Sequence, residues 1–203
     1  MKILLSLIVM LLPVFLLSPS MAEQINFLDD FQQEITGLNY TNFANWNVTK
    51  GSVDSYYGLG FDRSNIFVDM GGTTGQFGTL TSKQAFNFSP DYIYKFSFDL
   101  AGSQRFTWDE IPSTVTMSLG NIYQNQSFYL LAYDPWQTFT YVFTVNSPIS
   151  ANLVFEGSGI NPNVGLLLDN VRITSTPVPE PALMVLLGIS MASIVGLKRW
   201  WKQ

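Results

Sequence analysis

Acidic side chains are the first candidates for chemistry in this chain, because it contains no histidine and no cysteine. Those absences remove the usual general base, the Ser-His-Asp triad, thiol chemistry and an ordinary zinc site. Two adjacent acidic pairs remain, Asp29-Asp30 and Asp109-Glu110. Neighbouring residues on a strand point to opposite faces, so neither pair readily flanks a glycosidic bond as hydrolysis requires. We therefore predict no catalytic residues and interpret both pairs as solvated loop residues.

Aromatic side chains are the second candidate group, since they make up 15% of the chain. Sugar rings stack on aromatic faces through their apolar C–H surfaces, while Asn, Gln and Asp side chains bond the hydroxyls. Trp108, Tyr133 and Trp136 are the predicted glycan-binding residues, and the two tryptophans neighbour the acidic segments Asp109-Glu110 and Asp134-Pro135. For each aromatic residue alone, packing in the core or at the edge of a sandwich is the alternative. The full set in or beside predicted loops is Tyr56, Tyr57, Trp108, Tyr123, Tyr133 and Trp136.

The segments that must position these residues are predicted to be β-strands. Residues 92–100 and 139–145 alternate aromatic or aliphatic side chains with mostly polar ones, a period of two. Gly, Asn, Pro and Ser separate these and several shorter apolar runs, and no stretch inside the domain shows a helical stripe. The pattern predicts an all-β fold, an antiparallel two-sheet jelly-roll sandwich. The shorter runs cover 66–70, 114–119, 152–156 and 166–174.

The last predicted strand contains an irregularity. Leu166 and Leu168 share one face, whereas Val171 and Ile173 have the opposite parity, so the apolar register slips at Asp169-Asn170. A β-bulge produces such a slip and re-aims side chains, which would turn Asp169 towards a ligand such as a cation. The alternative is that 166–168 is buried on both faces.

The charge of the folded part limits its partners. Residues 23–177 carry six basic and 14 acidic residues, a net charge of −8, whereas the whole chain has −5. This acidic balance disfavours nucleic acid and is compatible with divalent cations or neutral polymers. We predict one domain at 23–174, followed by a polar linker at 175–178.

The N-terminal segment has the pattern of a secretory signal peptide over residues 1–22. Lys2 precedes an apolar stretch at 3–17, and Ser20 and Ala22 are small residues at the −3 and −1 positions of a cleavage site. We predict export and cleavage after Ala22.

The C-terminal segment, 179–203, has the pattern of a membrane anchor. Residues 182–197 are uncharged and span about 24 Å as a helix, which is short of a bilayer core of about 30 Å. Trp200 and Trp201 at the headgroup level extend the predicted transmembrane helix to 182–201, and the adjacent cations place its C-terminus in the cytoplasm.

Pro179, Glu180 and Pro181 stand directly before this helix. The motif, the helix and the basic end together resemble the PEP-CTERM sorting signal of bacterial exported proteins. The resemblance implies recognition of Pro179-Glu180-Pro181 by an exosortase, a membrane thiol transpeptidase, after a transient stay in the inner membrane. Cleavage near the motif would then release the domain to the cell surface or the extracellular matrix.

Four segments of the domain also resemble a family of exported PEP-CTERM proteins: 46–54, 98–105, 115–121 and 163–171. That family is similar to galactose-binding-like jelly rolls and carbohydrate-binding β-sandwich modules. The resemblance implies a structural calcium ion held by Asp169, with Asp29 or Asp30 as partners. Here 161–163 reads Asn-Pro-Asn where relatives tend to have Gly-Asp-Asn, so one carboxylate is missing, although backbone carbonyls also supply calcium ligands.

These observations lead to one main hypothesis and two alternatives. The main hypothesis is a non-enzymatic surface or matrix protein that associates with exopolysaccharide. The first alternative is a structural matrix or adhesion protein that does not bind glycan directly. The second is a polysaccharide-active enzyme, which would have to lose turnover, and not binding, when one carboxylate is removed.

Overall fold

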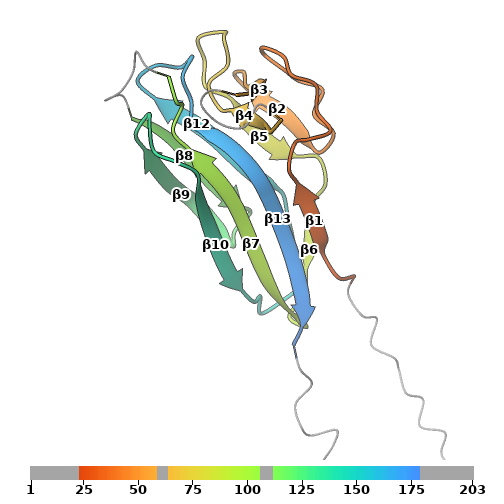
Figure 1. Ribbon diagram of the computed structural model, residues 1–203. Coiled ribbons are helices and arrows are strands. Elements are labelled where there is room, and N and C mark those ends of the chain that lie inside the picture. Colours follow the sequence, from red (N-terminus) through yellow and green to blue (C-terminus); the bar gives the residue numbers. More distant parts are fainter. Residues whose placement is uncertain (1–22, 59–63, 106–111, 179–203) are drawn as a thin grey trace, which may run out of the picture.

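The computed structural model describes residues 23–58, 64–105 and 112–178, which fold into two main antiparallel sheets packed as a sandwich (Figure 1). Within these ranges the structure contains strands and turns but no helix. The predicted all-β sandwich is therefore confirmed. The predicted signal peptide with Ala22, the motif Pro179-Glu180-Pro181 and the transmembrane helix 182–201 lie outside the described residues. Among the residues that are described, none forms a helix long and apolar enough to cross a membrane.

The larger sheet has the strand order β10-β7-β13-β4-β3, and β1 also pairs with β13. Its strands are β1 (Asn26–Asp29), β3 (Asp54–Tyr57), β4 (Ile66–Asp69), β7 (Tyr92–Ala101), β10 (Gln137–Phe143) and β13 (Leu167–Pro177). The last strand continues beyond the predicted end of the domain at residue 174. Ser175, Thr176 and Pro177 pair with β7, so most of the segment predicted as a linker belongs to the sheet.

The smaller sheet has the order β2-β5-β12-β8-β9, and a separate pair joins β11 to β6. The strands are β2 (Trp46–Lys50), β5 (Thr79–Ser82), β8 (Ser113–Leu119), β9 (Tyr123–Leu130), β12 (Leu153–Gly159), β6 (Phe86–Phe88) and β11 (Ile149–Ala151). Along the chain β5, β7, β8, β10, β12 and β13 alternate between the two main sheets, with β9 as a hairpin partner of β8. This alternation is the connectivity of a jelly roll.

The core lies between the sheets and is dominated by aromatic rings. On β7 the side chains predicted to share one face, Tyr92 to Leu100 at every second position, are each at most 4% exposed. Phe98 is at the centre of this core, with edge-to-face contacts to Phe128 and Phe155 at 5.1 Å and a stacked contact to Phe139 at 5.6 Å. The period of two therefore arises because one face of β7 is buried.

The predicted β-bulge in the last strand is confirmed. The register between β13 and β7 shifts between Asp169 and Arg172, and Asn170 has a positive φ of 51°. The alternative interpretation also holds, since Leu166, Leu167 and Leu168 are all buried. Both apply because the face of the larger sheet that is turned away from the core carries an apolar cluster of its own at this point.

The described chain enters and leaves the sandwich at the same end (Figure 1). Gln24 Nε2 donates to the carbonyl of Ser175, and the backbone N–H of Ile25 donates to Ser175 Oγ, both at 2.8 Å. The strands β3 and β4 lie at the other end of β13, where Leu167 pairs with Asp69. The two ends of the sandwich are thus different in kind, one carrying the termini and the other the loops beside β3 and β4.

Candidate functional site

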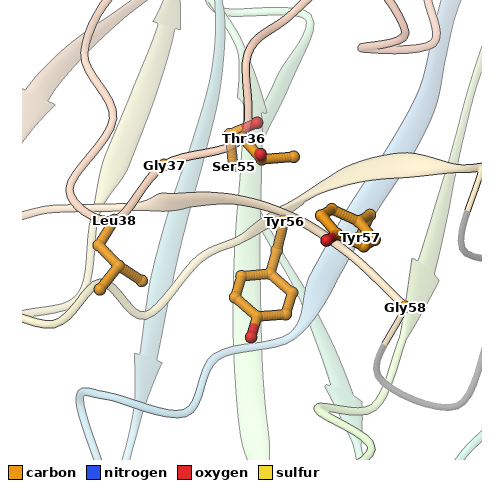
Figure 2. Close-up of a pocket in the computed structure, with 7 residues that line it drawn as sticks. All are labelled: Thr36, Gly37, Leu38, Ser55, Tyr56, Tyr57 and Gly58. Atoms are coloured by element: carbon orange, nitrogen blue, oxygen red, sulfur yellow. The ribbon is translucent and has the colours of Figure 1, made fainter.

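A shallow, open pocket of about 440 Å³ lies against the edge strand β3, as Figure 2 shows. One side is formed by the loop residues Thr36, Gly37 and Leu38, and the other by 55–58. Its volume lies in the range of small-molecule sites in proteins, about 300–1,000 Å³. The pocket is therefore large enough for one or two sugar rings.

Hydrogen bonds fix the loop wall of this pocket to β3. Gly37 and Ser55 exchange backbone hydrogen bonds of 2.8 and 2.9 Å, and the N–H of Tyr40 donates to the carbonyl of Val53 at 2.9 Å. The N–H of Asn39 donates to Asp54 Oδ1 at 2.7 Å. Residues 37–40 thus run along β3 as a short added edge, which fixes one wall of the pocket.

Tyr56 and Tyr57 give the pocket its chemistry. Their rings are 6.3 Å apart and inclined by only 27°, and Figure 2 shows both side chains on the pocket wall. Tyr57 is 48% exposed, and the neighbouring loop exposes Leu38 by 60%. Exposed aromatic faces with phenolic hydroxyls at their ends combine an apolar body and a polar handle. This combination suits a sugar ring better than a charged or purely apolar ligand.

The side chain of Tyr56 also packs against an apolar cluster on the outer face of the larger sheet. Phe67, Ala101 and Leu167 form this outer cluster, and Tyr56 and Trp136 pack against it. The ring of Trp136 meets Phe67 edge-on at 5.8 Å, and its side chain is half-buried. The outer cluster covers part of Trp136, which is the packing given above as the alternative for each aromatic residue.

The other two predicted glycan-binding residues are placed differently. Tyr133 is 41% exposed in the turn between β9 and β10. Trp108 lies outside the described residues, as does the acidic pair Asp109-Glu110. Of the three predicted glycan-binding residues, the structure therefore describes only Tyr133 and Trp136. Tyr56 and Tyr57, which were expected in or beside a loop, form the end of β3.

The carboxylates proposed for calcium do not all point the same way. Asp29 is buried and accepts hydrogen bonds from Trp46 Nε1 at 2.8 Å, Asn45 Nδ2 at 3.0 Å and the N–H of Phe31 at 2.9 Å. Since Trp46 is fully buried in the main core, Asp29 faces inward as a structural acceptor. Asp30, its neighbour, accepts from the N–H of Gln32 at the surface.

Asp169 lies on the opposite side of the sheet from Asp29. It is 2% exposed and accepts from Asn65 Nδ2 at 2.8 Å and from the N–H of Asn170 at 2.7 Å. Burial raises the pKa of Asp169 to about 6, while these two hydrogen bonds lower it and the charges of Asp99 and Asp30 raise it further. In the part of the chain that the structure describes, no three acidic residues are grouped closely enough to hold a metal ion.

A further buried carboxylate, that of Asp69, joins several loops behind the pocket. Asp69 is fully buried and accepts from the N–H groups of Gly71 and Gly165 at 2.9 Å and from Arg105 Nη2 at 2.8 Å. A Cβ on Gly165 would lie 2.2 Å from the nitrogen of Gly71, so both glycines are needed for this approach. Burial raises the pKa of Asp69 to about 7, although Arg105 and the two N–H groups lower it.

No family model matches the sequence, and no curated protein matches it. Solved structures similar to this chain include the CBM22-1 xylan-binding domain of Paenibacillus barcinonensis Xyn10C, at 10% identity and a TM-score of 0.45, over 76% of this chain and 97% of that one. A family 35 carbohydrate binding module from an environmental isolate has 14% identity and a TM-score of 0.39, over 76% and 99%.

An isomalto-dextranase of Arthrobacter globiformis also matches, at 16% identity and a TM-score of 0.39, over 63% of this chain and 21% of that one. At such identities and TM-scores, neither a site residue nor a function is transferred from these structures to this chain.

Proposed function

We propose that this chain is an exported, non-enzymatic surface or matrix protein that binds exopolysaccharide through the pocket beside β3. The observation that carries the proposal is the pair of nearly parallel tyrosine rings on the wall of an open, preformed pocket. Preformed aromatic walls bind neutral polymers with little loss of conformational freedom. The acidic character of the domain fits a neutral glycan better than an acidic one.

The non-enzymatic part of the proposal is supported by four of the five buried carboxylates that the structure describes, all except Asp54. Asp29, Asp69 and Asp169 each accept at least two hydrogen bonds from the protein itself. Glu34, which is also buried, accepts from the N–H of Ala44 and from the hydroxyl of Tyr40. A general acid or base needs a free lone pair or proton directed at a substrate, and these four groups are committed to holding loops and strands.

Replacing Tyr57 by alanine is expected to weaken binding to polysaccharide isolated from the producing organism by about two- to tenfold. Aromatic stacking contributes about 0.5–1.5 kcal/mol, and 1.4 kcal/mol is a factor of ten in affinity. The measurement is retardation of the full chain in non-denaturing detergent gels that contain the polymer. The matched control is Tyr129→Ala, because Tyr129 is 62% exposed on β9 in the other sheet.

Equal retardation of the Tyr57 and Tyr129 variants would move the binding site away from the pocket. If even the unaltered chain is not retarded, the protein is better explained as a structural matrix or adhesion protein. Retardation accompanied by shortening of the polymer would instead favour the enzyme.

We further propose that the chain reaches its site through an exosortase-type transpeptidase acting at Pro179-Glu180-Pro181, after export and a transient stay in the inner membrane. The sequence pattern of the last 25 residues supports this. Mature protein recovered from outside the cell is expected to lack Trp200 and Trp201, which intact-mass spectrometry detects directly. Mature protein that retains both tryptophans would refute processing at the motif.

A further inference from the structure

Two buried oxygen atoms behind the pocket lack a hydrogen-bond donor among the described residues. They are Asp54 Oδ2 and Asn39 Oδ1. Their residues are joined by the 2.7 Å hydrogen bond from the N–H of Asn39 to Asp54 Oδ1. The amide of Asn39 is oriented by a second bond, in which Nδ2 donates to Thr73 Oγ1 at 2.7 Å. Leaving a buried acceptor without a partner is costly, and a charged one more so.

The charge around these atoms is also unbalanced. Asp54 is fully buried and stands opposite Asp69, also fully buried, in the pairing of β3 with β4. Arg105 is the cation seen at this pair, and both of its terminal nitrogens are engaged, Nη2 with Asp69 and Nη1 with the carbonyl of Asn163 at 2.8 Å. Within 23–58, 64–105 and 112–178, the other ion pair is the exposed Lys50–Glu156 pair. Asp54 thus lacks a counter-charge in the described structure.

We propose that Asp54 Oδ2 and Asn39 Oδ1 are ligands of a small, hard cation, with calcium as the best fit, which joins the loop 36–40 to β3. Both atoms are oxygens, as calcium requires, and one is a carboxylate. Two side chains supply only part of the six to eight ligands, so backbone carbonyls and water complete the shell. Binding is therefore expected in the weak range of extracellular modules, with a Kd of about 10⁻⁴–10⁻³ M.

This site differs from the one that the sequence resemblance implies. Asp29 ends β1, Asp30 follows it and Asp169 belongs to β13. Asp54 and Asn39 lie on the opposite side of β4, at the edge of the sheet. The loop that the cation would hold forms one wall of the tyrosine pocket. If the proposed glycan function is correct, polymer binding should weaken when the cation is removed.

The test measures thermal unfolding of the full chain in detergent, without polysaccharide, in excess chelator and in 5 mM calcium. The unaltered chain should unfold at a higher temperature in calcium, since a cation that binds only the folded state stabilises it. Asp54→Asn should abolish this calcium response. In chelator the variant should be at least as stable as the unaltered chain, because it removes a buried carboxylate that has no counter-charge. The matched control Asp30→Asn should keep the full response.

A second variant serves if Asp54→Asn does not fold. Asn39→Asp replaces the amide with a third carboxylate at a left-handed position, φ 50°, which Asp tolerates. It should bind calcium at least tenfold more tightly than the unaltered chain by calorimetric titration, and should be less stable in chelator.

The outcomes that overturn the proposal are distinct. No calcium response of the unaltered chain would show that a water molecule, or an inverted Asn39 amide, satisfies Asp54 instead. A response lost in Asp30→Asn but kept in Asp54→Asn would place the ion at the site near Asp169. Because these measurements use no polymer, they can succeed or fail independently of glycan binding.

Discussion

Replacing Asp69 by alanine is expected to lower the free energy of unfolding by about 3–5 kcal/mol, because one side of a buried ion pair is removed. Arg105 would lose its carboxylate partner, and the N–H groups of Gly71 and Gly165 would lose their acceptor. Three segments far apart in sequence meet at this carboxylate, so their loops should loosen together. The measurement is urea unfolding of the full chain at pH 8, where the carboxylate is ionised.

Glu156→Ala is the matched control for Asp69→Ala. It removes the other ion pair that the structure describes, in which Lys50 Nζ lies 2.8 Å from Glu156 Oε1, with side chains 72% and 45% exposed. Exposed pairs contribute about 0–1 kcal/mol. If the two variants lower the free energy of unfolding by amounts that differ by less than 1 kcal/mol, Asp69 does not hold these loops.

The second large effect is expected in the core, where Phe98→Ala should cost about 3–5 kcal/mol. Phe98 is fully buried and contacts rings from both sheets, Phe139 in one and Phe128 and Phe155 in the other. Its removal leaves a cavity between layers that can close only if the sheets move together. Since single domains are stable by about 5–15 kcal/mol, the loss is a large part of the total.

Val142→Ala on β10 provides the comparison for Phe98→Ala, because Val142 is 65% exposed and should change stability by less than about 0.5 kcal/mol. Both variants are compared with the unaltered chain by urea unfolding. A Phe98 variant as stable as the Val142 variant would mean that the two sheets do not share the core described above.

The sequence predicted those parts of the fold in which one strand face is buried and the other is not. β7 shows this directly, and so does the bulge at Asp169, where a change of parity was visible in the apolar pattern. Strands β1, β3, β6 and β11 have only three or four residues, too few to show a period. β9 was also missed, because its residues 124–127 (Gln-Asn-Gln-Ser) are polar on both faces and hide the alternation.

The candidate site was harder to predict, because it depends on contacts between segments distant in sequence. Trp136 was predicted to bind glycan, and Phe67, 69 residues away in the sequence, covers one side of it. The resemblance implies Asp29 or Asp30 as a partner of Asp169 in a calcium site, and Asp29 accepts from Trp46, a donor that no local pattern indicates. Tyr57 was among the candidate aromatic residues. By contrast, nothing in the sequence of the loop 36–40 indicated that this loop pairs with β3.

The position of the chain ends bears on how the protein would resist a pulling force. The termini leave at one end of β13, and the tyrosine pocket lies near the other, about 35 Å away for an 11-residue strand. With the C-terminus tethered and a polymer held in the pocket, tension would run along β13. The hydrogen bonds of β13 to β7 and β1 are perpendicular to that strand, so they would be sheared together and not opened one at a time. Such a geometry resists tension best along the line that joins a tethered end to a bound polymer.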